Sequence, residues 1–227
     1  MKFARRILRI FYPARCPYCG KVTRPFEEGC QACISQNPAQ PEAFRINHPF
    51  LGNGNSEMIC CSPWLYRDKP KAAVLRFKFR GHREYAEPFG RSMARSVEEN
   101  FSNVDFDLVC EIPLTKRRRR ERGFDQGRLL AKEAARSLKL PYVSALEKSK
   151  GNQIQHELSF TERWENVKKV YQLKKNTEVR DKTVLLCDDI VTSGATMWEA
   201  AKVLLAHGAK SVYGVSFCRA EKQKREG

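Results

Sequence analysis

Residues 184–196, with the sequence VLLCDDIVTSGAT, constrain the fold of this chain more than any other segment. They begin with an apolar run that suits a strand buried on both faces, and Cys187 continues this run without a charge. Asp188 and Asp189 follow where we expect the strand to end, which in an open parallel sheet is the edge at which ligands bind. Two adjacent carboxylates repel each other, so the pair requires hydroxyl donors, water or cations around it.

The loop after the acidic pair, TSGAT at residues 192–196, leads directly into a predicted helix. Its peptide N–H groups and three hydroxyls can converge on one anion at the helix N-terminus, and Gly194 permits a close backbone approach. The alternative is an ordinary polar turn, since Asp, Ser, Thr and Gly are common there. The order of strand, acidic pair, loop and helix favours a binding site over an ordinary turn. In this site the carboxylates bind hydroxyl groups and the adjacent loop binds a phosphate, as a ribose 5-phosphate requires. The residues of this expected site are Asp188, Asp189, Thr192, Ser193, Gly194, Ala195 and Thr196.

From residue 50 onward, short apolar runs alternate with amphipathic stretches, which is typical of strands joined by helices in a largely parallel sheet. The clearest unit is a strand over residues 183–187, a helix over 195–207 that stops at Gly208, and a strand over 211–217. We also expect extended structure over 58–66, 107–112 and 142–146, and helices over 71–79, 85–99 and 127–138.

Four of the nine cysteines form two paired hooks, Cys16-x2-Cys19 and Cys30-x2-Cys33, separated by ten residues. This spacing suits a compact tetrahedral zinc site, and four cysteine ligands leave no open coordination position, so we expect the zinc to be structural. Two disulfides or four free thiols are the alternative, which a reducing compartment disfavours. The other cysteines lie in or beside predicted strands, where we expect buried packing: Cys60, Cys61, Cys110, Cys187 and Cys218.

The composition divides the chain into two parts. Residues 13–41 are rich in Cys, Pro, Gly and polar residues without a sustained period, and residues 36–55 continue this loop-like composition. Near the N-terminus, apolar residues between positions 3 and 11 fall on one helical face, which either docks on a core or binds a membrane. We therefore predict an N-terminal helix, zinc-binding module and linker over residues 1–49, and an α/β domain over residues 50–227.

Lys and Arg number 42 against 26 Asp and Glu, giving a formal net charge of +16. This excess favours polyanionic partners such as nucleic acid or phosphate-rich ligands, although solubility alone is a simpler explanation. The charge is concentrated in KRRRRER at residues 116–122, between a predicted strand and a predicted helix. Arginine makes bidentate contacts to phosphate, so we favour anion binding over a merely solvated surface. The residues expected to contact a diphosphate or a nucleic-acid backbone are Lys116, Arg117, Arg118, Arg119, Arg120 and Arg122.

Apolar runs in this sequence are short. Arginines at positions 5, 6 and 9 interrupt the N-terminal one, so no signal-peptide core forms there, and nothing downstream approaches the length of a transmembrane span. We therefore expect a cytoplasmic protein without integral membrane contact.

Residues 184–196 resemble the phosphoribosyl diphosphate (PRPP) motif of type I phosphoribosyltransferases. The resemblance implies that Asp188 and Asp189 hold the ribose hydroxyls, that residues 192–196 wrap the 5-phosphate, and that magnesium accompanies the diphosphate. It also implies an α/β fold, with a type I phosphoribosyltransferase-like parallel sheet flanked by helices beside the small N-terminal four-cysteine zinc module. Enzymes of this type displace pyrophosphate from the anomeric carbon with a nitrogen nucleophile.

The combination of motifs is more specific than the PRPP motif alone. The cysteine module, the RxRGFxQ-like segment at residues 120–126, the QxxLSxxER segment at residues 155–163 and the PRPP motif together resemble the ComF family of competence-associated proteins. Asp125 stands where Asn is frequent and Ser193 where Thr is frequent, and neither change removes the implied chemistry. Residues 155–163 fall where type I phosphoribosyltransferases carry a flexible hood. The resemblance implies a role in uptake of single-stranded DNA during natural transformation, with other DNA-uptake proteins as partners.

Three functions follow from these observations. The first is a competence protein that binds PRPP and single-stranded DNA. The second is a catalytically active phosphoribosyltransferase that uses a nitrogen nucleophile, and the third is a PRPP-sensing regulator that binds nucleic acid. The sequence names neither an acceptor substrate nor an oligomeric state.

Overall fold

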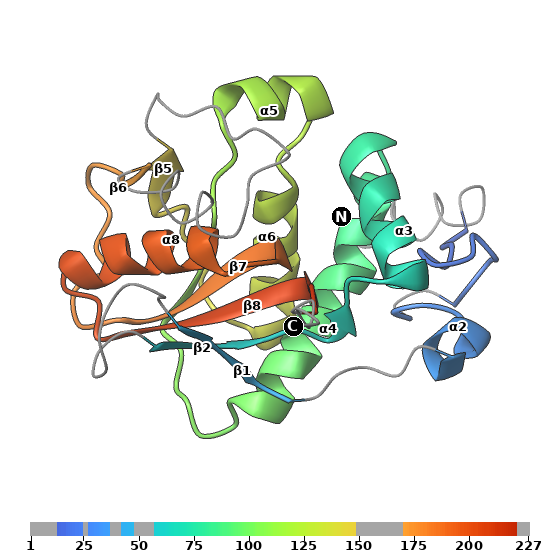
Figure 1. The fold of residues 1–227 in the computed structure, drawn as a ribbon, viewed down its shortest axis with the longest axis horizontal. Coiled ribbons are helices and arrows are strands. Elements are labelled where there is room, and N and C mark those ends of the chain that lie inside the picture. The colour runs from blue at the N-terminus through green and yellow to red at the C-terminus, as the bar shows by residue number, and fades with distance from the viewer. Residues whose placement is uncertain (1–12, 25–26, 37–41, 48–56, 149–169, 222–227) are drawn as a thin grey trace, which may run out of the picture.

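The structure is a computed structural model that describes residues 13–24, 27–36, 42–47, 57–148 and 170–221. Within these residues a six-stranded sheet has the order β1-β2-β8-β7-β4, with β3 also paired to β8 (Figure 1). All of its pairs are parallel except β1 with β2, so the predicted parallel sheet is confirmed, with one antiparallel edge strand. The strands are β1 (Phe44–Asn47), β2 (Glu57–Cys61), β3 (Trp64–Leu65), β4 (Leu108–Glu111), β7 (Thr183–Val191) and β8 (Ser211–Arg219).

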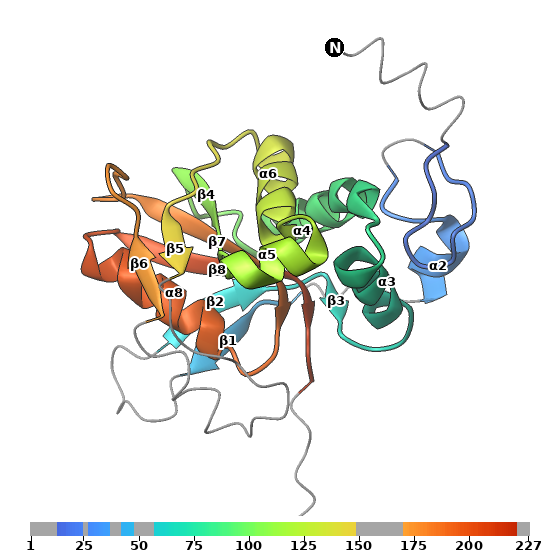
Figure 2. The ribbon, with the colours of Figure 1, turned by 90° about the horizontal axis from the view of Figure 1, so that it is seen from above.

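Helices cover both faces of this sheet, and strand β7 is buried between them (Figure 2). Leu185 and Cys187 belong to the core cluster that includes buried residues of α3, α4 and α6, whereas Val184 and Leu186 belong to the cluster that includes α8. This alternation is the period of two that a strand imposes on its side chains. The helices are α3 (Asp68–Phe79), α4 (Ala86–Asn100), α6 (Gln126–Leu138) and α8 (Ala195–Ala206), and they confirm the predicted helices at these places.

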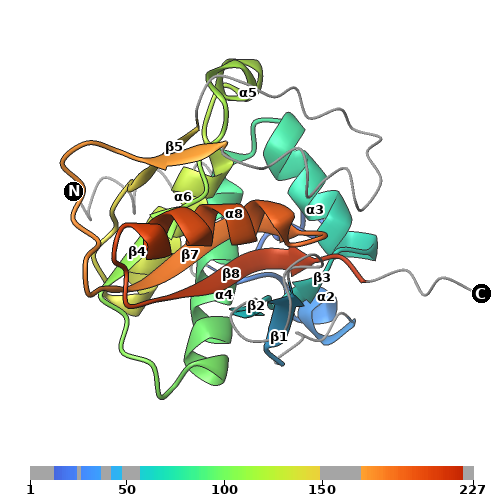
Figure 3. The ribbon, with the colours of Figure 1, turned by 60° about the vertical axis from the view of Figure 1, so that its left-hand side comes forward.

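Smaller elements complete the described part of the chain. A two-stranded antiparallel sheet of β5 (Leu146–Lys148) and β6 (Tyr171–Leu173) lies beside α8 (Figure 3). The others are α2 (Gln31–Gln36), the 3-10 helix η1 (Arg83–Tyr85) and α5 (Lys116–Arg122). Helix α8 stops before Gly208, whose φ of +90° confirms the left-handed stop expected from sequence.

Three local expectations are wrong. The strand predicted over residues 183–187 continues through the acidic pair to Val191, because β8 is equally long and pairs with it on both sides of Asp189, Asp188 with Ser216 and Ile190 with Cys218. The strand expected over residues 142–146 is reduced to a bridge from Tyr142 to Val109, and β5 begins only at Leu146. Strand β1 lies within residues 36–55, which the composition described as loop.

Candidate functional site

The acidic pair lies near the carboxyl end of β7, and its two side chains point to opposite faces of the sheet, as successive strand residues do. Asp189 is nearly buried on the side of α3, where its Oδ1 lies 2.7 Å from Nζ of Lys78. Asp188 is partly exposed on the other side, and its Oδ1 accepts a hydrogen bond of 2.8 Å from the backbone N–H of Asp189. The pair therefore offers carboxylate oxygens to both sides of the strand end.

Burial shapes the charge state of the groups around Asp188. It raises the pKa of Asp188 to about 7, and the charge of Asp189 adds to this rise, while Lys78 and Lys148 act in the opposite direction. Burial also lowers the pKa of Lys148, at the end of β5, to about 8. The Nζ of Lys148 lies 5.2 Å from the ring centre of Tyr171 in β6. A carboxyl and an amine that both titrate near neutral pH thus line this side of the strand end.

The loop after β7 is held in place by Gly194, whose φ is +83°. A side chain at Gly194 would clash with Cγ2 of Ile46 in β1, so the close approach of the loop to this strand needs glycine there. Ser193 Oγ accepts a hydrogen bond of 3.3 Å from the N–H of Ala195, the first residue of α8. Residues 192–196 therefore join the end of β7 to the positive end of the α8 dipole, which favours a bound anion.

Cations from two helices approach Asp189. A pocket of about 140 Å³ is lined by Lys78 and Phe79 of α3 and by Arg118, Glu121 and Arg122 of α5. Arg122 is half-buried, and this burial lowers its pKa. A small positive pocket therefore adjoins the acidic pair through Lys78, which lines the pocket and contacts Asp189.

The other members of the predicted cation cluster lie differently. Arg117 pairs with Glu121 at 3.2 Å, and Arg119 and Arg120 are exposed to solvent. The structure describes the backbone of Lys116, which is the first residue of α5. Sequence reasoning thus located the cluster, and the fold selects Arg118 and Arg122 as the members that face the pocket.

The RGFDQ segment at residues 122–126 builds the corner that holds Arg122 in place. Gly123 ends α5 with a φ of +73°, and the Phe124 ring packs 5.5 Å from that of Phe77 in α3. Asp125 caps α6 by accepting the N–H of Arg128 at 3.1 Å. Buried Gln126 accepts a hydrogen bond of 3.0 Å from Arg122 and donates one of 3.4 Å to the carbonyl of Lys78. The corner therefore fastens α5 to the end of α3.

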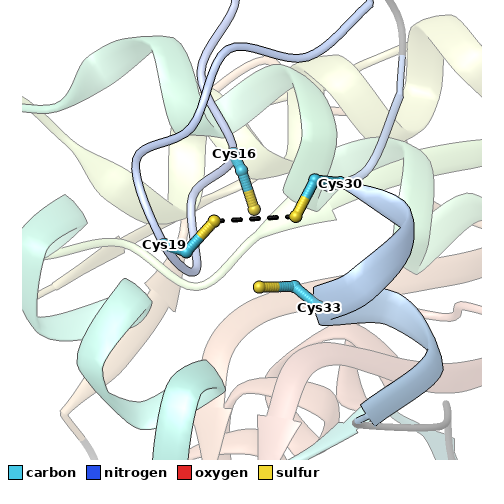
Figure 4. A group of neighbouring side chains, drawn as sticks. All are labelled: Cys16, Cys19, Cys30 and Cys33. Atoms are coloured by element: carbon cyan, nitrogen blue, oxygen red, sulfur yellow. Dashed lines mark hydrogen bonds between the residues drawn. The ribbon is translucent and has the colours of Figure 1, made fainter.

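The four cysteines of the N-terminal module converge, with all Sγ atoms within 4.8 Å of one another (Figure 4). Sulfurs bound to one zinc at about 2.3 Å in a tetrahedron lie roughly 3.8 Å apart, and Cys19 and Cys30 Sγ are separated by 3.6 Å. Slight burial of Cys19 raises its pKa, but the N–H of Lys21 and the neighbouring thiols outweigh this and lower the pKa to about 7. The cluster fits a metal ion, as predicted for a structural zinc module. The other five cysteines are buried, which agrees with their predicted packing role.

Sequence reasoning missed Lys78 and Lys148. Neither carries a local signal, because each is one lysine in a basic chain. Only the fold brings Lys78 of α3 into contact with Asp189, and Lys148 of β5 near enough to Asp188 to affect its pKa. The expected N-terminal helix between residues 3 and 11 and the hood segment at residues 155–163 lie outside the described residues.

Comparison with known proteins places the chain in a family. A sequence model of the phosphoribosyl transferase domain matches residues 125–226. Competence protein ComFC of Bacillus subtilis (strain 168) is 31% identical over 205 residues, which cover 90% of this chain and 77% of that protein. The chain belongs to the ComF family of competence proteins.

Other ComF-related proteins match over a similar length. Competence protein F of Haemophilus influenzae is 24% identical over 210 residues, covering 90% of this chain and 84% of that protein. DNA utilization protein YhgH of Escherichia coli (strain K12) is 26% identical over 208 residues, covering 90% and 83%. In this ComF chain the type I phosphoribosyltransferase fold carries the four-cysteine cluster at its N-terminal side. Among the described helices, none has the length and apolar character needed to cross a membrane.

Proposed function

We propose that this chain binds PRPP, a ribose 5-phosphate that carries a diphosphate, together with magnesium. The observation that carries the proposal is the meeting of three features at one strand end: the Asp188–Asp189 pair, the loop of residues 192–196 and the pocket of Lys78, Arg118 and Arg122. The carboxylates suit the ribose hydroxyls, the loop suits the 5-phosphate and the cations suit the diphosphate. Magnesium would arrive with the diphosphate, whose oxygens suit a hard cation.

We further propose that the chain is a cytoplasmic competence protein that binds single-stranded DNA and acts in DNA uptake and natural transformation, in contact with other DNA-uptake proteins. The names of its relatives, competence proteins and DNA utilization proteins, support this role. A net charge of +16 supports contact with a nucleic-acid backbone. In this proposal residues 1–49 form the zinc module and a linker, whose last part includes strand β1 of the main sheet, and residues 50–227 form the rest of the ligand-binding domain.

A phosphoribosyltransferase activity is the second candidate function, because the proposed site for ribose hydroxyls adjoins a cationic pocket where a leaving diphosphate could be stabilised. A pyrophosphate-release assay with magnesium, PRPP and ammonia or nucleobases separates the two. Binding without release of pyrophosphate supports the competence role without catalysis, and sustained release supports the enzyme.

The DNA-binding part of the proposal has its own test. If backbone phosphates are neutralised by several lysines and arginines, the logarithm of the association constant for oligothymidylate should fall linearly with the logarithm of salt concentration, with a slope of about −0.7 per contact. Fluorescence anisotropy over a potassium chloride series measures this slope. A slope near zero would rule out the proposed phosphate contacts.

A further inference from the structure

Phe79 stands out among the described residues, because 64% of its surface is exposed although it is a large apolar side chain. It ends helix α3, and Leu75, one turn earlier, is also 39% exposed. The guanidinium carbon of Arg122 lies 5.3 Å from the centre of the Phe79 ring, so a cation already lies over the ring. An exposed aromatic ring beside a guanidinium on a packed helix end is a platform on which nucleic-acid bases stack.

Phe79 also borders two hollows. The first is the pocket of about 140 Å³ described above, and the second is a groove of about 370 Å³ lined by Ala72, Leu75, Arg76, Phe79 and Arg80. Together the two linings contribute five cationic side chains and one carboxylate, and that carboxylate, Glu121, is already 3.2 Å from Arg117. An apolar ring with positive charge on both sides suits a single strand, because a base can stack on the ring while the cations contact the neighbouring phosphates.

The cations of this surface are connected to the Asp188–Asp189 pair. Lys78, which lines the first pocket, lies 2.7 Å from Asp189, and Arg122 is tied through Gln126 to the carbonyl of Lys78. The cations beside Phe79 are therefore the same ones to which the diphosphate of PRPP is assigned above. Two polyanions cannot both neutralise so small a set of charges at close range.

We propose that the α3–α5 face, formed by Leu75, Arg76, Phe79, Arg80, Arg118 and Arg122, binds single-stranded DNA in competition with PRPP. One base stacks on Phe79, and an adjacent phosphate takes the place of the PRPP diphosphate beside Lys78, Arg118 and Arg122. A single strand is required because the bases of a duplex are already stacked and present no free ring face. The inference rests on the proposed function and adds that its two ligands exclude each other at one pocket, with reciprocal effects on affinity.

The test measures the affinity for a labelled oligothymidylate by fluorescence anisotropy. Phe79→Ala should weaken binding by about 5- to 150-fold, which corresponds to the loss of one stacked base. Phe79→Trp should retain binding because it retains a stacking ring. Leu205→Ala, which truncates an exposed apolar side chain on α8, is the matched control and should bind like the unmodified chain. Phe79 is exposed, so its variants should unfold at the same temperature as the unmodified chain.

The competition is measured in the same assay with magnesium and PRPP added. PRPP should displace the oligonucleotide from the unmodified chain, whereas Asp189→Asn, which lacks a carboxylate for the ribose hydroxyls, should need a PRPP concentration about 10-fold higher or more. The proposal is overturned if Phe79→Ala binds as Leu205→Ala does, or if PRPP that binds in calorimetry leaves the oligonucleotide affinity unchanged. If the unmodified chain has no affinity for the oligonucleotide, the DNA part of the proposed function fails as well. If the unmodified chain binds and Phe79→Ala binds equally well, only the assignment of DNA binding to this surface fails.

Discussion

At the scale of single residues, the contact between Lys78 and Asp189 decides the character of the site. Their side chains are only 14% and 12% exposed, so water hydrates both charges poorly and each charge compensates the other. Such a pair need not add net stability, because desolvation offsets the attraction, but removing one partner leaves an uncompensated charge. The pair thus holds the Asp189 carboxylate against a cation at the end of β7.

We predict that Lys78→Ala lowers the free energy of unfolding by about 3–5 kcal/mol, because it leaves Asp189 nearly buried and unpaired. Urea unfolding of the unliganded protein measures this change. A double-mutant cycle with Asp189→Ala should give a coupling energy of about 1–3 kcal/mol. Arg67→Ala is the control, since Arg67 and its partner Glu221 are 60% and 59% exposed, and it should cost less than about 1 kcal/mol. A cycle with no coupling would contradict the account of this pair.

At the scale of elements, the corner between α5 and α6 shows how a motif specifies structure and a site together. Each residue from Gly123 to Gln126 has a local role, as a left-handed stop, a core ring, a helix cap and a buried hydrogen-bonding side chain. The result is that Arg122 is fixed against α3 rather than free in solvent. The arginine run alone could not achieve this orientation.

We predict that Asp125→Ala destabilises the protein by about 1 kcal/mol, because α6 loses the side chain that caps its N-terminus. Asp125→Asn should be close to neutral, since Asn caps helices as well as Asp does. Thermal unfolding of the two variants side by side gives the comparison. Equal losses in both variants would show that the charge of Asp125, rather than its capping bond, is what stabilises the corner.

The elements also show what the sequence could predict. Strand β7 and helix α8 were predictable because an apolar run and a helical period end in a loop of distinctive residues, so local pattern and fold agree. The extension of β7 through Asp188 and Asp189 was not predictable, because it depends on pairing with β8, a long-range contact. Lys78 was missed for the same reason: its role comes from how α3 packs, and its own neighbours in sequence carry no sign of it.

At the scale of the whole molecule, helix α3 joins the cysteine module to the end of β7. Near the start of α3, Nζ of Lys69 lies 3.8 Å from the Sγ of Cys33. Farther along, Arg76 donates to the carbonyls of Pro17 and Tyr18 at 2.5 and 3.1 Å. The end of the same helix carries Lys78 to Asp189. One helix therefore contacts both the cysteine module and, more than a helix turn farther along, the pocket beside Asp189.

We predict that the purified chain carries one zinc ion, and that Cys19→Ser loses it and unfolds at a lower temperature, because metal binding contributes directly to folding of such a module. Inductively coupled plasma mass spectrometry measures the zinc content, and differential scanning calorimetry measures the unfolding temperature. A chain that contains no zinc and shows two disulfides in non-reduced peptide maps would contradict the assignment.

Isothermal titration calorimetry with magnesium and PRPP determines whether the end of β7 binds PRPP. The unmodified chain should bind at one site. Asp189→Asn should weaken binding by about 10-fold or more, the cost of losing a hydrogen bond to a charged group. Asp105→Asn, an exposed carboxylate before β4, is the matched control and should bind normally. Unchanged affinity in Asp189→Asn, or no heat of binding in the unmodified chain, would contradict the claim.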